Sequence, residues 1–233
     1  DLGDILAKPE RLTAVIRAEI VEIRDAYGDV RRTEISLDHL NLSTEDLIEP
    51  QDVVVTLSHA GYAKAQPVSD YQAQRRGGRG KSATAVKDED FIEKFFIAHT
   101  HDTLLCFSNL GKVYWCKCYD IPQAGRLSLG KAVVNLLNME EQERLTTVLA
   151  VPEFAPGKYV LMATRNGLVK KTDLMSYSRP RSGGIIAINL LEGDELIAAH
   201  ITDGTLNVFL GSAEGKAIRF HESDVRASGR VAT

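Results

Sequence analysis

The chain has 233 residues, 44% of them hydrophobic and 26% charged, and its formal net charge is −4. This composition excludes a disordered chain and supplies enough apolar side chains for a substantial core. No apolar run approaches the roughly 20 residues of a membrane-spanning helix, and the small negative charge taken alone argues against a polyanionic partner.

An amphipathic helix is predicted near the N-terminus. Between Pro9 and Tyr27, apolar residues recur at helical spacing, at Leu12, Val15, Ile16, Ile20 and Ile23. Pro9 suits the first turn of a helix, and Gly28 suits the position just past its end. Three further apolar residues, Leu2, Ile5 and Leu6, precede this segment. We expect residues 1–35 to be the end of a helical hairpin or coiled coil.

From residue 36 to 233 a β-rich unit is repeated. Its first feature is a hairpin whose turn carries a glycine, and these glycines lie 50, 56 and 48 residues apart: Gly61, Gly111, Gly167 and Gly215. A glycine-led strand, an acidic turn and another apolar strand follow. Four strands in about 50 residues is the size of a propeller-type blade. We therefore predict about three and a half blades, because a sandwich would not explain the recurring order.

The glycine-led strands are expected to begin at Gly80, Gly130 and Gly184. The strands after the acidic turns are expected at residues 95–99, 145–150 and 196–201. The fourth unit ends near its middle, the chain begins with Asp1, and no terminating motif closes it. We therefore expect a fragment of a longer polypeptide.

Charge is in phase with the repeat. Basic residues lie between the turn glycine and the glycine-led strand, and acids lie in the next turn. Solvated charge is the simpler interpretation of one such loop, but three phased repetitions predict a continuous basic rim that contacts phosphates without reading bases. The predicted DNA contacts beyond the first unit are Lys112, Lys117, Arg126, Lys131, Arg165, Lys170, Lys171, Arg179, Arg181, Lys216 and Arg219.

The most specific segment is a heptapeptide in the first unit, followed by Lys81: Gln74, Arg75, Arg76, Gly77, Gly78, Arg79 and Gly80. Its arginines offer bidentate donors to phosphate oxygens, and its glycines let a duplex backbone approach closely. Gly80-Lys81-Ser82 imitates the end of a nucleotide-binding loop. That loop needs a glycine where Arg75 stands and a helix afterwards, so we reject ATP binding here.

The heptapeptide resembles the gyrase A box, the signature of the C-terminal domain family of gyrase A, one of the two proteins of DNA gyrase. Resemblance to this family extends over essentially the whole chain, at residues 31–35, 45–48, 56–58, 98–102, 107–108 and 212–216. The paralogous topoisomerase IV protein has a degenerate or missing box, so the intact heptapeptide favours gyrase. A protein-interaction propeller, in which the basic stripe is incidental, remains an alternative.

The resemblance implies an all-β fold, a β-pinwheel whose blades exchange strands, after an α-helical coiled-coil segment. It also implies a domain that wraps duplex DNA for a type II topoisomerase, in which gyrase A and gyrase B form an A2B2 assembly in the cytoplasm, at the nucleoid. The holoenzyme would use Mg²⁺ and ATP, the latter on gyrase B. The fragment itself would hold no cofactor and would lack the catalytic tyrosine.

Other candidate sites are weaker. His99 with His101, and Cys116 with Cys118, alternate along the chain, but neither pair has structural-zinc spacing, so we predict no metal site. An odd count of three cysteines, with Cys106 the third, is typical of reduced thiols in a cytosolic protein. Trp115 could stack on a base, but packing is the more common role. No nucleophile motif supports catalysis by the fragment.

Overall fold

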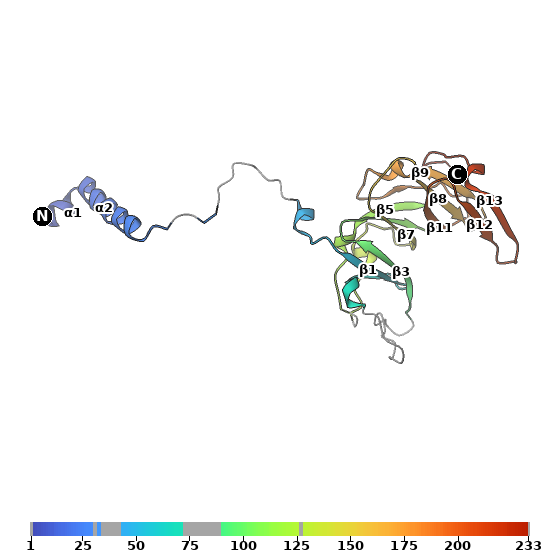
Figure 1. Ribbon diagram of the computed structural model, residues 1–233, viewed down its shortest axis with the longest axis horizontal. Helices are drawn as coiled ribbons and strands as arrows, with labels where there is room; N and C mark the ends of the chain where they lie inside the picture. Colours follow the sequence, from blue (N-terminus) through green and yellow to red (C-terminus); the bar gives the residue numbers. More distant parts are fainter. Residues whose placement is uncertain (1, 30–31, 34–42, 72–89, 126–127, 233) are drawn as a thin grey trace. The chain divides into compact units, whose positions relative to one another are not determined.

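The computed structural model describes residues 2–29, 32–33, 43–71, 90–125 and 128–232 (Figure 1). The chain divides into two compact units, residues 1–42 and 43–233. The first contains the helices α1 (Leu2–Ala7) and α2 (Pro9–Tyr27). Among the described residues, no helix is long and apolar enough to cross a membrane.

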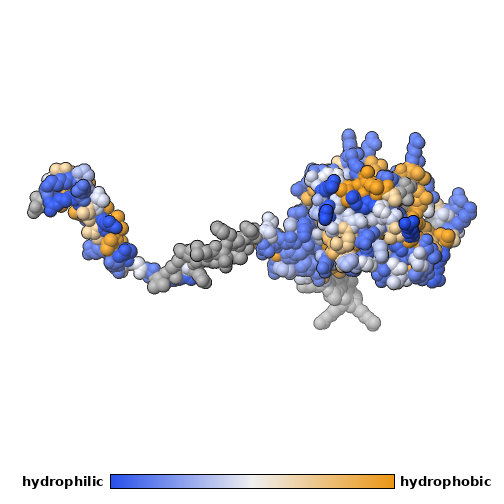
Figure 2. Space-filling view, turned by 90° about the horizontal axis from the view of Figure 1, so that it is seen from above, coloured by the Kyte–Doolittle hydropathy of each residue, from blue (hydrophilic) through white to orange (hydrophobic). Residues whose placement is uncertain are grey.

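The predicted helix is confirmed with its bounds, and α1 precedes it as a separate short helix. The carboxylate of Asp4 forms ion pairs with Lys8, at 2.8 Å, and with Arg11. No residue of α1 or α2 is buried, and the apolar stripe is open to solvent, with Ile20 61% and Tyr27 82% exposed. Figure 2 shows these helices with orange apolar patches on their surface.

The described residues of the second unit form four successive β-hairpins, as the repeat predicts. Their strands are β1 (Asp52–Ser58) with β2 (Tyr62–Pro67), β4 (Thr103–Ser108) with β5 (Lys112–Lys117), β8 (Tyr159–Thr164) with β9 (Val169–Asp173), and β12 (Asn207–Gly211) with β13 (Ala217–His221). The strands predicted after the acidic turns are also confirmed, as β3 (Ile92–His99), β7 (Leu145–Val151) and β11 (Leu196–Thr202). Each pairs antiparallel with the first strand of its own unit.

Short 3₁₀ turns lie between these strands. One follows the second hairpin strand in every unit: η2 (Val68–Asp70), η3 (Cys118–Asp120), η5 (Leu174–Tyr177) and η6 (Glu222–Asp224). Two others are η1 (Thr44–Leu47), which precedes β1, and η4 (Val133–Asn135). In η1, Ser43 and Asp46 form a reciprocal capping box.

The same hydroxyl turn closes all four hairpins. A serine or threonine three residues before the turn glycine accepts a hydrogen bond from the backbone N–H just after it, at 3.2–3.3 Å: Ser58, Ser108, Thr164 and Ser212. The turn glycines have φ between +76° and +87°, a region that side chains with a Cβ avoid. The recurring glycine is therefore required by the turn itself.

The glycine-led strands differ from the prediction. They are only two residues long, β6 (Lys131–Ala132) and β10 (Ile185–Ile186), and β6 is followed at once by η4. Each pairs with the hairpin of the preceding unit: β6 with β2, and β10 with β5. The successive sheets are thus joined by exchanged strands. The third such strand, from Gly80, lies outside the described residues.

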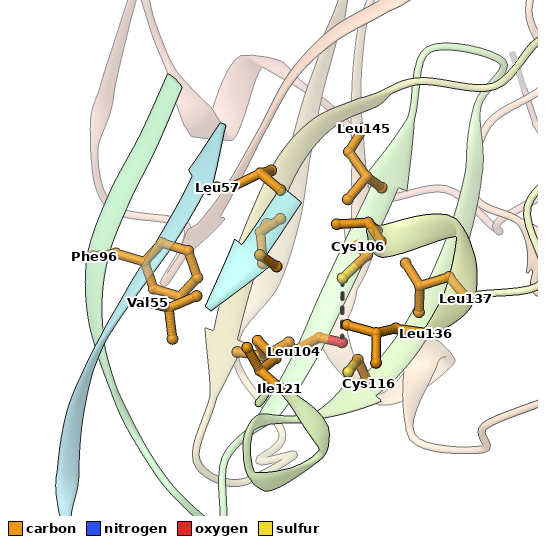
Figure 3. Close-up of a pocket in the computed structure, with 13 residues that line it drawn as sticks. Val55, Leu57, Phe96, Leu104, Cys106, Cys116, Ile121, Leu136, Leu137 and Leu145 are labelled. Atoms are coloured by element: carbon orange, nitrogen blue, oxygen red, sulfur yellow. Dashed lines mark hydrogen bonds between the residues drawn. The ribbon is translucent and has the colours of Figure 1, made fainter. Parts of the chain in front are cut away.

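Two apolar cores lie between successive units. The first joins β1–β3 to β4, β5 and β7, and the second joins that sheet to β8, η5, β10 and β11. The first core contains a cavity of about 30 Å³ into which Cys106 and Cys116 project among aliphatic side chains (Figure 3). Burial raises the pKa of Cys116 and of Cys118 to about 12, and raises that of Cys106 further. These thiols are packing groups.

Candidate nucleic-acid interface

The basic loops span the junctions between units. In the second unit the loop after η3 returns along β2 of the first: Ala65 N–H donates to the Pro122 carbonyl at 3.0 Å, and Ala124 N–H donates to the Ala65 carbonyl at 3.1 Å. In the fourth unit Ser228 N–H donates to the Lys171 carbonyl at 2.8 Å. Each loop therefore belongs structurally to two units.

The third-unit loop is joined to the second unit by two side-chain hydrogen bonds. Trp115 Nε1 donates to the Tyr177 carbonyl at 2.8 Å, and Asn138 Nδ2 donates to the Ser182 carbonyl at 3.2 Å. The hydrogen bond from its indole N–H gives Trp115 a packing role between units, the second of the two roles that the sequence left open.

Four of the predicted contacts are exposed, and no ion pair holds them within the described parts of the chain: Lys131, Arg179, Arg181 and Arg219. The first three lie on or beside the junction loops, and Arg219 lies on β13. Guanidinium and ammonium groups in this state can neutralise phosphates without first breaking another pair.

Other predicted contacts are engaged with carboxylates. Lys117 Nζ lies 2.9 Å from a Glu45 oxygen, and Arg165 Nη2 lies 2.9 Å from a Glu195 oxygen. The two remaining pairs are Lys112 with Glu140, and Lys216 with Glu214 at 3.7 Å. These pairs are partly exposed, so each is worth at most about 1 kcal/mol, and a phosphate could displace the carboxylate.

Two of the predicted contacts are not at the surface. Lys170 is 3% and Lys171 7% exposed. The Lys171 ammonium donates to the Glu222 carbonyl at 2.6 Å and lies 5.3 Å from the centre of the Tyr159 ring, and the Lys170 ammonium donates to three carbonyls. Because neither ammonium faces solvent, we remove both lysines from the proposed DNA path.

The acids of the turns act partly inside the fold, which the sequence-based interpretation missed. Asp90 accepts from Ala60 N–H at 2.9 Å, and Asp194 accepts from Asn166 N–H at 3.0 Å, so each carboxylate binds the hairpin turn of its own unit. Glu143 is 6% exposed. It accepts from Ser108 Oγ at 2.8 Å, from the Tyr114 hydroxyl and from a backbone N–H.

These contacts set the ionisation of the three carboxyls. Burial raises the pKa of Asp90, Glu143 and Asp194, but the hydrogen bonds they accept outweigh it and hold each pKa below its usual value. The carboxylates therefore remain charged and fasten the hairpin turns. The acids that stay on the surface are fewer than the charge pattern alone suggests.

Several predicted positions fall outside the described residues: the heptapeptide Gln74–Gly80, Lys81 and Arg126. They remain sequence predictions. For the histidine and cysteine pairs, the described residues contain no group of three or more His, Cys, Asp or Glu side chains that could hold a metal ion. His101 Nε2 lies 3.1 Å from the Glu45 carbonyl, and its backbone N–H donates to His99 Nδ1 at 3.3 Å.

A comparison with protein families decides the affiliation. The model described as "DNA gyrase C-terminal domain, beta-propeller" matches residues 52–99, 102–152, 158–203 and 206–233, which are the four repeated units. The chain belongs to this family. The predicted resemblance and the predicted fold class, a propeller-like β array preceded by a helix, are both confirmed.

Relatives of the DNA gyrase C-terminal domain family include whole gyrase A proteins. The chain is 57% identical, over 94% of its length, to DNA gyrase A of Aeromonas salmonicida. It is 54% identical, over its whole length, to DNA gyrase A of Haemophilus influenzae. It covers 24% and 26% of these proteins, so the chain spans about a quarter of the length of the curated relatives it matches.

Solved structures share the fold. The C-terminal domain of DNA topoisomerase IV superposes with a TM-score of 0.67 at 31% identity, covering 80% of this chain and 56% of that one. A DNA gyrase A C-terminal domain superposes with a TM-score of 0.64 at 27% identity, covering 78% and 58%. Fold similarity alone thus does not separate the two branches, whereas the relatives at 54–57% identity are gyrase A proteins.

Proposed function

We propose that this chain binds duplex DNA and bends it around the basic rim of its β-unit, without sequence specificity. The observation that carries the proposal is the recurrence of exposed basic residues on loops that cross successive unit junctions, with Arg179 and Arg181 the clearest case. Bending a short duplex by a large angle costs on the order of several kcal/mol. Contacts distributed over several units are suited to offset that cost.

In the whole protein, the wrapped DNA would present a neighbouring segment to the enzyme gate. ATP-driven strand passage would then introduce negative supercoils. Within this proposal the remainder of gyrase A and the gyrase B protein are the partners, in an A2B2 assembly. Mg²⁺ and ATP serve the holoenzyme, and this fragment contributes no catalytic residue. We place the whole protein in the cytoplasm, at the nucleoid.

The heptapeptide is the predicted anchor of one end of the wrap. Replacing Arg75, Arg76 and Arg79 together with Ala in the whole enzyme should abolish supercoiling and leave relaxation of supercoiled DNA mostly intact. Agarose gels of both reactions measure this. Loss of both activities together would contradict the wrapping role, because relaxation does not require a wrapped segment.

The protein-interaction alternative makes a different prediction for the isolated chain. A DNA-wrapping chain shifts unrelated duplexes in a gel, binds them less tightly as salt rises, and changes the linking number of nicked circles closed in its presence. An interaction module would bind no duplex. DNA binding that does not vary with salt would also contradict the proposal, because phosphates would then not be the target.

A further inference from the structure

The turn η1, which precedes the first repeated unit, buries no side chain. None of its residues is buried, and Leu47 is 74% exposed. It is folded by its own capping box: the Asp46 carboxylate accepts from Ser43 Oγ at 2.8 Å and from the Ser43 N–H at 2.7 Å. These hydrogen bonds lower the pKa of Asp46. Such a turn keeps its own shape but is weakly attached, because little apolar surface is exposed when it detaches.

Glu45 attaches this turn to the β-rich unit through two polar contacts. Its carboxylate oxygen Oε1 lies 2.9 Å from Lys117 Nζ, and its backbone carbonyl lies 3.1 Å from His101 Nε2. The Lys117 ammonium also lies 3.5 Å from the His101 carbonyl, so the two anchoring residues adjoin. The side chains of Glu45 and Lys117 are 40% and 35% exposed, and an ion pair in this setting contributes little to stability.

The chain is fastened independently from Glu49 onward. Thr100 is 2% exposed, and its Oγ1 donates to the Glu49 carbonyl at 2.9 Å and accepts from the Gln51 N–H at 3.1 Å. The Thr100 N–H donates to the Gln51 carbonyl at 2.9 Å. These bonds do not involve Glu45. Loss of the Glu45 contacts would therefore free residues 43–48 and leave β1 in place.

Lys117 differs from the other paired DNA-contact candidates in the origin of its acid. The other three pair with acids of their own repeated unit: Lys112, Arg165 and Lys216. Glu45 lies before β1, outside all four units, and Asp46 and Glu49 are close to it in sequence. A carboxylate and a phosphate oxygen bind an ammonium through the same charge-assisted hydrogen bond, and they repel each other. A duplex that reaches Lys117 therefore competes with Glu45.

We propose that η1 is a latch that DNA opens. In the free chain, Glu45 pairs with Lys117 and holds residues 43–48 against the β-rich unit. A duplex phosphate that binds Lys117 displaces the Glu45 carboxylate and frees this segment. The latch thus weakens DNA binding at Lys117 and couples it to release of the chain that precedes β1. This inference rests on the proposed DNA-binding function.

Charge-removal variants of the 233-residue chain test the competition. Glu45→Ala removes the latch carboxylate. Glu49→Ala is the matched control, because it removes an equal charge on an exposed side chain that forms no ion pair among the described residues. Both are made alone and together with Lys117→Ala. Anisotropy of a labelled duplex of unrelated sequence gives the dissociation constant. Circular dichroism melting shows which variants are folded at the assay temperature, and Lys117→Gln replaces Lys117→Ala if that variant is not.

Glu45→Ala should tighten duplex binding by up to about fivefold, the factor that corresponds to a partly exposed ion pair. Glu49→Ala should tighten it less, because its charge acts only through screening solvent. Lys117→Ala should weaken binding, and in that background Glu45→Ala should gain no more than Glu49→Ala does. Equal gains from the two glutamate variants in the wild-type background, or a larger gain from Glu45→Ala that persists without Lys117, would overturn the competition.

A probe on η1 tests the release itself. Leu47→Cys introduces an exposed thiol, whereas the three native cysteines are buried and have raised pKa values, so a spin label attaches selectively at position 47. Its electron paramagnetic resonance spectrum should show greater mobility when duplex is added. With Glu45→Ala the label should be mobile without DNA and unchanged by it. Unchanged mobility in the wild-type background while duplex binds would overturn the latch, whereas a chain that binds no duplex would refute the proposed function.

Discussion

Strand exchange predicts that glycines of equal backbone conformation differ in their tolerance of alanine. Gly61 and Gly130 have φ of +82° and +85°. Nothing lies within 4 Å of a Cβ added at Gly61, whereas a Cβ at Gly130 would lie 2.3 Å from the Ala63 carbonyl oxygen and 2.9 Å from Lys64 Cβ. The Gly61→Ala variant is therefore a matched control for the close approach of β6 to β2.

The expected loss of stability in each alanine variant is the sum of a backbone cost and the cost of any steric overlap. A left-handed backbone costs an alanine about 1–2 kcal/mol at either position. At Gly130 the overlap must also be relieved: real Cβ contacts stay above 3.0 Å, so a 2.3 Å contact requires a shift of at least 3.0 − 2.3 = 0.7 Å in a backbone atom. Overpacking of this kind costs about 1–3 kcal/mol more. Gly130→Ala should thus lower the melting temperature by roughly 2–12 °C beyond Gly61→Ala.

Thermal melting of the 233-residue chain, followed by circular dichroism, measures both variants under one condition. Equal melting temperatures would refute the reasoning, because they would mean that β6 does not closely approach Ala63. The second junction provides a repetition, since a Cβ at Gly184, with φ of +70°, would meet the Tyr114 ring at 2.6 Å.

Two further predictions concern charge. The folded-state pKa of Glu143 is below its usual value, so the carboxylate contributes stability above about pH 4.5 that is lost as pH falls through the folded pKa. Glu143→Gln should therefore lower the melting temperature at pH 7, with a difference that narrows toward pH 3.5; a constant difference would contradict the ionic role. Replacing Arg179 and Arg181 with Ala should lower the slope of log DNA affinity against log salt by about two. Arg165→Ala removes a residue that is paired with Glu195, so it should change this slope less. Equal changes per arginine would contradict the distinction between paired and unpaired arginines.

The hairpins could be predicted from the sequence because their determinants are local. A serine or threonine three residues before a glycine, between apolar runs, specifies the turn, and in all four units the structure has a hairpin there. The helix from Pro9 to Tyr27 was predictable for the same reason, since its stripe and end signals lie within one segment.

Strand exchange was not predictable from the residues themselves. Alternation of apolar residues indicates a strand but carries no information about its partner, so Gly130 and Gly184 gave the start of each strand and not the sheet it joins. The short length of β6 also depends on the strand with which it pairs. Only Tyr62 and Ala63 pair with β6, and the chain then turns into η4 to pack Val133 in the core.

The charge pattern of the sequence indicates where the basic loops recur, but it does not show which individual lysines are exposed. Basic loops do recur in phase, but a lysine in a strand and a lysine in a loop look alike when charges are summed. Lys170 was assigned to the surface and lies inside, and Lys64, which was not singled out at all, lies in the equivalent place. The available signal was a lysine three residues after a turn glycine, in the second strand of the hairpin.

The loops that carry the proposed DNA contacts are the same loops that join the units, and this couples the two roles. A phosphate bound at Arg179 or Arg181 engages a segment whose backbone also binds the preceding unit, through Trp115 and Asn138. A ligand that binds only the folded arrangement stabilises it by mass action. If the chain binds DNA as proposed, DNA along the rim would therefore tighten the junctions it crosses.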